Sequence, residues 1–178
     1  MKLFPCVKKW MIPEGALLQS INEIALDGSM GNEGIVLWLG KRQRKVAKVT
    51  HLIVLRGPDV IKEPNFLIIK PSLFNLVTDV VIELGAALIG QMHSHAGYRV
   101  DLSWADCIYG VSVPYYLSIV VPHYAMKIGT DIGGSSVHVF EPGTGYRRLT
   151  KREASRCIHI ISGEQVPVLT VGEDSDGR

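Results

Sequence analysis

The chain has 178 residues, of which 47% are hydrophobic and 20% are charged, and its formal net charge is +2. This length fits one compact domain, and this composition excludes a chain that is too polar to bury a core. So small a net charge gives no reason to expect a nucleic-acid partner.

The first half of the chain predicts two helices and two strands. Apolar residues at helical spacing, with a proline at the start, predict a helix over 13–26. GIVLWLG (34–40) and VAKVTHLIVL (46–55) have the pattern of buried strands, and we interpret the basic KRQRKVAK (41–48) as the solvated tip of a hairpin between them. A second helix is predicted over 71–85, where proline precedes the apolar face and glycine ends it.

The second half predicts a central strand, one short helix and further strands. AALIGQMH (86–93) is a bounded apolar strand, and SWADCIYGV (103–111) a short helix. Later strands are expected at YYLSIVV (115–121), SSVHVFEP (135–142) and GYRRLTK (145–151), with the loop GTDIGG at 129–134. Because helices and strands mix without strict alternation, we expect an α/β (α+β) fold, a mixed β-sheet flanked by helices in a single domain over 1–165. Residues 166–178 are interpreted as a polar C-terminal tail.

Cysteine spacing and the lack of a long apolar segment indicate where the protein works. Cys6, Cys107 and Cys157 are odd in number and widely separated, which fits neither a disulfide framework nor a paired-cysteine zinc site. The N-terminal MKLFPCVKKWMIPEG interrupts its apolar residues with charge and proline, unlike a signal peptide. No run reaches the roughly 18 apolar residues of a membrane span. We therefore expect a cytoplasmic protein without a membrane partner.

Two histidines separated by one serine end the predicted strand at 86–93. Side chains two residues apart in an extended chain project to the same face, so His93 and His95 can present two imidazoles to one point. A catalytic zinc ion commonly takes three protein ligands, and Asp106 is the nearest further candidate on a rigid element. Alternatively, Ser103 and Asp106 form a capping box for the helix at 103–111, and the histidines are polar residues at a strand end.

The full pattern is His93-x-His95, seven residues, Ser103, two residues and Asp106, directly after ALIGQM. This spacing resembles the signature of the JAMM (MPN+) metalloprotease family, His-(Ser/Thr)-His-x7-Ser-x2-Asp with a glutamate well upstream. The family places that glutamate at the head of an apolar strand that ends in glycine. In EGIVLWLG, Glu33 has this position.

The resemblance implies a JAMM/MPN-type fold and a compact, prokaryotic-type, deubiquitinase-like isopeptidase. It implies one zinc ion (Zn²⁺) per chain, held by His93, His95 and Asp106 with water as the fourth ligand. It also implies that Glu33 is the general base, which returns the proton to the leaving amine, and that Ser103 donates its hydroxyl to the oxyanion.

The implied partner is a ubiquitin-like protein with an extended C-terminal tail, together with its conjugates. We expect cleavage after the C-terminal glycine, in deconjugation or in precursor maturation, in a bacterial ubiquitin-like conjugation pathway. Ala96 stands where the family often has proline, so the loop to Ser103 is expected to differ in shape. Two alternatives remain, a metallohydrolase of the same fold with a small substrate and a non-catalytic MPN-type scaffold. No oligomeric state is predicted.

Overall fold

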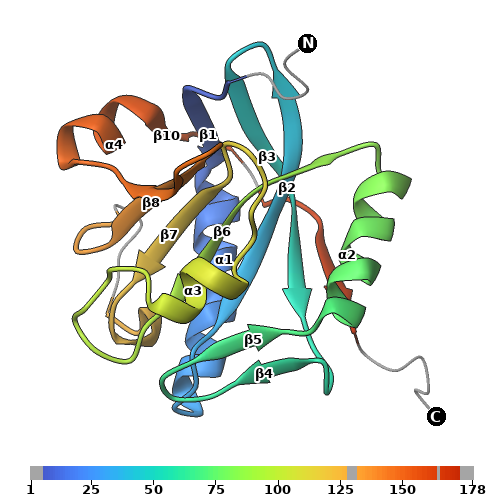
Figure 1. Cartoon of the computed structure of the whole chain (residues 1–178), viewed down its shortest axis with the longest axis vertical. Helices are drawn as coiled ribbons and strands as arrows, with labels where there is room; N and C mark the ends of the chain where they lie inside the picture. The colour runs from blue at the N-terminus through green and yellow to red at the C-terminus, as the bar shows by residue number, and fades with distance from the viewer. Residues whose placement is uncertain (1–5, 128–131, 164, 173–178) are drawn as a thin grey trace.

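A mixed β-sheet forms the centre of the computed structural model, which describes residues 6–127, 132–163 and 165–172 (Figure 1). The strands lie in the order β10-β1-β3-β2-β6-β7-β8-β9, and β11 also pairs with β3. In chain order the elements are β1 (Lys9–Pro13), α1 (Glu14–Ser29), β2 (Ile35–Gln43), β3 (Val46–Leu55), β4 (Val60–Lys62), β5 (Leu67–Ile69), α2 (Pro71–Glu83), β6 (Ala87–Ser94), α3 (Trp104–Tyr109), β7 (Leu117–Val121), the 3-10 turn η1 (His123–Ala125), β8 (Ser136–Glu141), β9 (Gly145–Arg148), α4 (Lys151–Cys157), β10 (Ile158–Ile161) and β11 (Val168–Val171). The predicted mixed sheet flanked by helices is confirmed.

Two apolar clusters, one on each face of the sheet, form the core. Successive side chains of a strand point to opposite faces, so Val36 and Trp38 of β2 enter one cluster while Leu37 enters the other. The first cluster is covered by α1 and the second by α2, through the buried residues Ala16, Leu17, Ile21 and Ile24 of α1 and Leu73 and Val77 of α2. The strands between the two helices are therefore shielded from water on both faces.

A glycine allows α1 to approach the start of β2 closely. A Cβ atom at Gly34 would lie 2.9 Å from Asp27 Oδ2 and 3.0 Å from the Ile24 backbone. Farther along β2, the Trp38 Nε1–H donates to Ser20 Oγ of α1 over 2.9 Å, so a buried polar pair adds to the packing. These contacts fix the segment that carries Glu33 against the helix.

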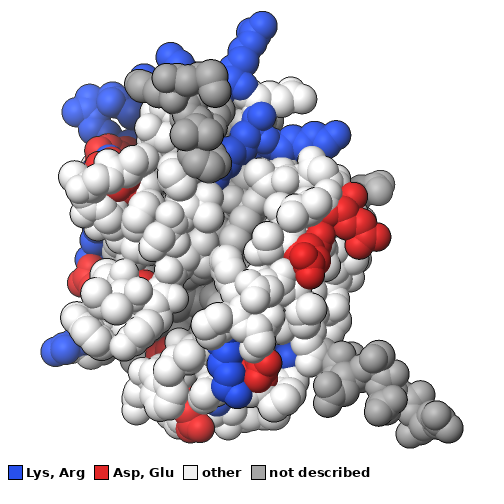
Figure 2. Space-filling view, turned by 45° about the vertical axis from the view of Figure 1, so that its right-hand side comes forward, with Lys and Arg blue, Asp and Glu red and all other residues white. Residues whose placement is uncertain are grey.

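The basic segment at 41–48 is confirmed as a hairpin tip. β2 and β3 are antiparallel and pair as far as Gln43 and Val46. Lys and Arg side chains gather at this end of the molecule, at the top of Figure 2. Arg42 is the exception, because its half-buried guanidinium donates to the carbonyl oxygens of Pro114 and Leu88 over 2.8 and 3.1 Å.

No helix in the described part of the chain has the length and apolar character needed to cross a membrane.

The N-terminal segment holds a strand that the sequence did not predict. The charge and proline of KWMIP interrupt its apolar residues, so no strand was predicted there, yet Trp10 and Ile12 are buried in the core. β1 pairs in parallel with β3 on one side and with β10 on the other. Parallel partners distant in sequence leave no local turn signal, which explains the omission.

The C-terminal part of the chain also differs from the prediction. Val168–Val171 lies in the expected polar tail but forms β11, which pairs in parallel with Leu52–Leu55 of β3. The expected strand at 145–151 ends at Arg148, because Thr150 and Glu153 form a capping box that begins α4. Residues 173–178 of the tail and 129–131 of the expected loop lie outside the described residues.

Candidate metal centre

Two histidines and one aspartate meet at the end of β6. One ligand atom each from His93, His95 and Asp106 lie within 4.8 Å of one another. His93 Nε2 is 3.7 Å from Asp106 Oδ1, and His95 Nε2 is 3.4 Å from Asp106 Oδ2. The histidines come from the end of β6 and the residue after it, and the aspartate comes from the first turn of α3. The three side chains that the sequence grouped are thus brought together.

The donor atoms of this cluster suit a metal ion. The His93 side chain is only 2% exposed, and its Nε2 has no hydrogen-bond partner within the described part of the chain. A buried ring nitrogen without a partner is costly, and a metal ion would satisfy it. Two imidazole nitrogens and one carboxylate oxygen are a ligand set that zinc accepts. These residues could therefore hold a metal ion.

The His95 ring is oriented by a backbone carbonyl. His95 Nδ1 lies 3.0 Å from the Arg99 carbonyl oxygen, which can only accept a hydrogen bond. Nδ1 therefore carries a proton, and in the neutral ring Nε2 presents its lone pair to the cluster. Burial lowers the pKa of His95, but the carboxylates of Asp106 and Glu33 outweigh it, and the net pKa is raised.

Ser103 and Asp106 form the capping box that the sequence offered as an alternative, and it coexists with the cluster. Ser103 Oγ accepts from the Asp106 N–H over 3.1 Å, and Asp106 Oδ2 accepts from the Ser103 N–H over 2.7 Å. This cap occupies Oδ2 and leaves Oδ1 directed towards His93. Burial raises the pKa of Asp106, but contacts from the two imidazoles and from Ser103 lower it far below its usual range. Asp106 is therefore anionic.

Glu33 lies beside the cluster at the start of β2. Its backbone N–H donates to the Glu63 carbonyl over 3.0 Å, and the residue is only 6% exposed. Glu33 lines a pocket of about 300 Å³ with His95, Ser103 and Asp106. Burial raises the pKa of Glu33 to about 7, with His95 opposing the shift and Asp106 adding to it. Without a metal, both forms of this carboxyl are populated at neutral pH.

Ser94, between the two histidines, is a positioning residue that the sequence did not identify. It is fully buried, and its Oγ accepts from the Gly34 N–H over 3.0 Å. In return, the Ser94 N–H donates to the Gly34 carbonyl, also over 3.0 Å. Two hydrogen bonds therefore connect the neighbour of Glu33 to the residue between His93 and His95. Their partners are 60 residues apart in sequence, and no local pattern reveals them.

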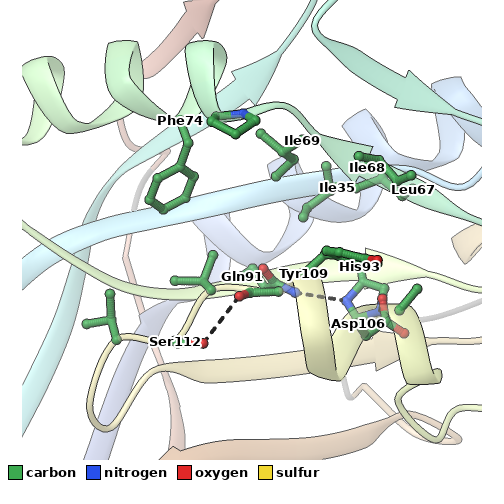
Figure 3. A pocket seen from close by; sticks show the side chains of 15 residues that line it. Ile35, Leu67, Ile68, Ile69, Phe74, Gln91, His93, Asp106, Tyr109 and Ser112 are labelled. Carbon is green, nitrogen blue, oxygen red and sulfur yellow. Dashed lines mark hydrogen bonds and ion pairs between the residues drawn. The ribbon is translucent and has the colours of Figure 1, made fainter.

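A larger, mainly apolar pocket of about 470 Å³ adjoins the cluster. Figure 3 shows Ile69 and Phe74 on one side of it, and Gln91 and His93 on the other. The remaining lining comes from β5, the start of α2, α3 and the segment after α3, with Leu67, Ile68, Pro71, Ala105, Asp106, Tyr109, Gly110, Val111, Ser112 and Val113, together with Ile35 of β2. The cluster thus lies between a smaller pocket, which Glu33 and Ser103 line, and a larger one with mainly apolar lining.

Comparisons with known proteins show the fold only. No protein-family model and no curated protein matches the chain. Among solved structures, the chain is similar to the protein DSY2949 from Desulfitobacterium hafniense, with a TM-score of 0.61 and 14% identity over 88% of this chain and 94% of that one. It is also aligned with AF2198, a JAB1/MPN domain protein from Archaeoglobus fulgidus, with a TM-score of 0.45 and 14% identity over 86% and 97% of the two chains. The first likeness shows a shared fold, and the second is too low to support a conclusion.

Replacing Ser94 by Ala should destabilise the protein. The change leaves the buried Gly34 N–H without its side-chain acceptor, which typically costs about 1–3 kcal/mol. Urea unfolding measures this loss, with the exposed Ser155→Ala on α4 as the control that changes stability by less than about 0.5 kcal/mol. Equal stabilities of the two variants would show that the Ser94 hydrogen bond does not hold the two segments together.

In metal-free protein, Glu33→Gln should remove a pH-dependent penalty. In the folded state Glu33 has a pKa of about 7, against an ordinary value of 4.5. The protonated Glu33 carboxyl therefore favours the folded state fully below pH 4.5, and this contribution is lost as the pH rises through 7. The advantage of the variant over the wild type should therefore grow across this window, to at most about 3 kcal/mol. Unfolding in a chelator at pH 5 and pH 8 tests this, and a constant difference would contradict it.

Proposed function

We propose that the protein is a zinc-dependent JAMM-type peptidase that cleaves after the C-terminal glycine of a ubiquitin-like modifier. The observation that carries the proposal is the convergence of five residues on one place. His93, His95 and Asp106 form the candidate ligand group, while Glu33 and Ser103 line the adjoining pocket. These residues, at the family's spacing, have the chemistry that amide hydrolysis requires.

Each residue has a role that its surroundings support. A zinc ion held by His93, His95 and Asp106 would supply Lewis acidity and lower the pKa of a bound water to about 7. Glu33 takes a proton from the attacking water and gives it to the leaving amine. Burial raises the pKa of Glu33 and a bound cation would lower it, so the two effects oppose each other in the zinc-loaded site. Ser103 Oγ accepts in the helix cap, so its own hydrogen is available to an oxyanion.

A strand edge beside the cluster suits an extended peptide substrate. Phe66 and Lys70 make their backbone hydrogen bonds towards the β4 side of the hairpin. In an antiparallel pair these bonds alternate, so Leu67 and Ile69 direct their N–H and C=O groups away from β4. Both residues line the pocket that also contains His93. A peptide in this pocket would pair with β5 as an added strand.

The larger pocket also fits the composition expected of a modifier tail. Glycines near the scissile bond carry no side chain, so the peptide backbone can approach the cluster closely. Farther from the cluster, the apolar lining of Phe74, Val111 and Val113 suits an apolar side chain of the tail. An uncharged, extended C-terminal segment is therefore the proposed substrate feature.

Hydrolysis of two substrates by the zinc-loaded protein tests the proposal. One substrate is a ubiquitin-like domain whose Gly-Gly terminus continues into a short extension, and the other is a small peptide with the same junction. We expect cleavage of the fusion after Gly-Gly, and a loss of about 10²-fold or more in Glu33→Gln with zinc retained. The exposed neighbour variant Glu63→Gln should keep full activity. Cleavage of the small peptide but not of the fusion would favour a small-substrate metallohydrolase. Cleavage of neither substrate would favour a non-catalytic scaffold.

Replacing Ile69 by Pro should impair cleavage of the fusion. Proline removes an N–H that points away from β4, so the hairpin keeps its own bonds while the substrate loses one. We expect kcat/KM for the fusion to fall about fivefold or more, mainly through KM. Ile69→Ala keeps the N–H and is the matched control for the lost side chain. An equal loss in both variants would contradict backbone pairing at this edge.

A further inference from the structure

We propose that Gln91 is a positioning residue that holds His93 in its metal-binding form, by accepting a hydrogen bond from His93 Nδ1–H through its side-chain carbonyl. The inference rests on the metal centre of the proposed function. It concerns a polar side chain at the bottom of the apolar pocket, where Figure 3 shows the contact between Gln91 and His93. The contact is a hydrogen bond within β6 that the five-residue motif does not include.

Gln91 makes three buried side-chain contacts. It precedes His93 by two residues in β6, so both side chains project from the same face, and it is only 7% exposed. Gln91 Nε2 lies 3.2 Å from His93 Nδ1 and 3.3 Å from Ser118 Oγ. Gln91 Oε1 accepts from the Tyr116 hydroxyl over 3.1 Å. Ser118 and Tyr116 are themselves fully buried, so water does not compete for this network.

The chemistry of a ligating imidazole determines which amide atom must face His93. The unpartnered Nε2 points to Asp106 and is the atom available to a metal, so the neutral ring then carries its proton on Nδ1. An amide NH₂ group cannot accept a hydrogen bond from this Nδ1–H, but the amide oxygen can. In the structure Gln91 Nε2 faces His93 Nδ1. This arrangement suits a ring whose unprotonated Nδ1 accepts a hydrogen bond from the amide NH₂ group. The metal-bound ring therefore requires a half-turn of the Gln91 amide.

The neighbours of Gln91 accommodate that half-turn without losing a partner. After it, the amide oxygen accepts from both His93 Nδ1–H and the Ser118 hydroxyl, and the NH₂ group donates to the Tyr116 oxygen. Hydroxyl groups can donate or accept, so both contacts persist with their directions reversed. The network is thus compatible with the metal-free and the metal-bound ring.

The two candidate histidine ligands then have equivalent supports. His95 Nδ1 is held by the backbone carbonyl of Arg99, and His93 Nδ1 by the side chain of Gln91. Groups that orient a ligating histidine in this way typically change metal affinity about 10- to 100-fold when they are removed. Of the two supports, only Gln91 can be removed by replacing a side chain.

Zinc affinity of Gln91 variants, measured by competition with a chromophoric chelator, tests the inference. Gln91→Met keeps the length but lacks a good acceptor, and we expect affinity to fall about 10- to 100-fold. Gln91→Glu can only accept when ionised, and should bind zinc at least as tightly as the wild type. Tyr116→Phe disturbs the network but keeps the acceptor, and should change affinity less than threefold. Equal affinities of Gln91→Met and wild type, or equal losses in the Met and Glu variants, would overturn the inference.

A measurement on the unmutated protein keeps the inference testable if a variant fails to fold. In an NMR spectrum of the zinc-loaded wild type, His93 should carry its proton on Nδ1, and the Gln91 NH₂ protons should show contacts to the Tyr116 ring. Contacts from these protons to the His93 ring would overturn the role of the carbonyl. Absence of zinc binding by the wild type would overturn the proposed function as well, whereas zinc binding with the wrong amide orientation would overturn this inference alone.

Discussion

The antiparallel pairing of β2 with β6 is the constraint on which the candidate metal centre depends. In this register Ile35 lies opposite His93, which places the start of β2 beside the end of β6. Ser94 extends the pairing by two hydrogen bonds to Gly34. Glu33 is thereby held beside His95, although the motif residues are distant in sequence. A shift of one residue would turn His93 to the opposite face of the sheet.

Polar groups at this end of the sheet are costly, and the fold offsets the cost elsewhere. His93, Glu33 and Gln91 are buried next to two apolar clusters that α1 and α2 cover. Burial of this kind destabilises a charged or unpartnered group, which explains the raised pKa of Glu33 and makes the unpartnered His93 Nε2 costly. A fold that keeps such groups in place is typical of a functional site, where local stability is given up for chemistry.

The sequence predicted those parts of the fold and the site that have local signals. Periodicity was sufficient for α1, α2, α3 and the central strands but not for α4, and the His-x-His-x7-Ser-x2-Asp spacing was sufficient to group His93, His95 and Asp106. The sequence alone could not predict β1 and β11, because their parallel partners lie far away in the chain. The contacts of Ser94 and Gln91 likewise depend on partners 60 and 25 residues away. Side-chain roles that need such partners emerge only from the folded structure.

The most direct test of a zinc centre is the metal content of the purified protein beside its Asp106→Ala variant, by elemental analysis after exposure to zinc and dialysis. The exposed Asp101→Ala, which removes a nearby carboxylate outside the cluster, is the matched control. The account predicts about one zinc ion per chain in the wild type and in the control, and loss of zinc in Asp106→Ala. Zinc absent from all three proteins, or retained equally in Asp106→Ala, would contradict it.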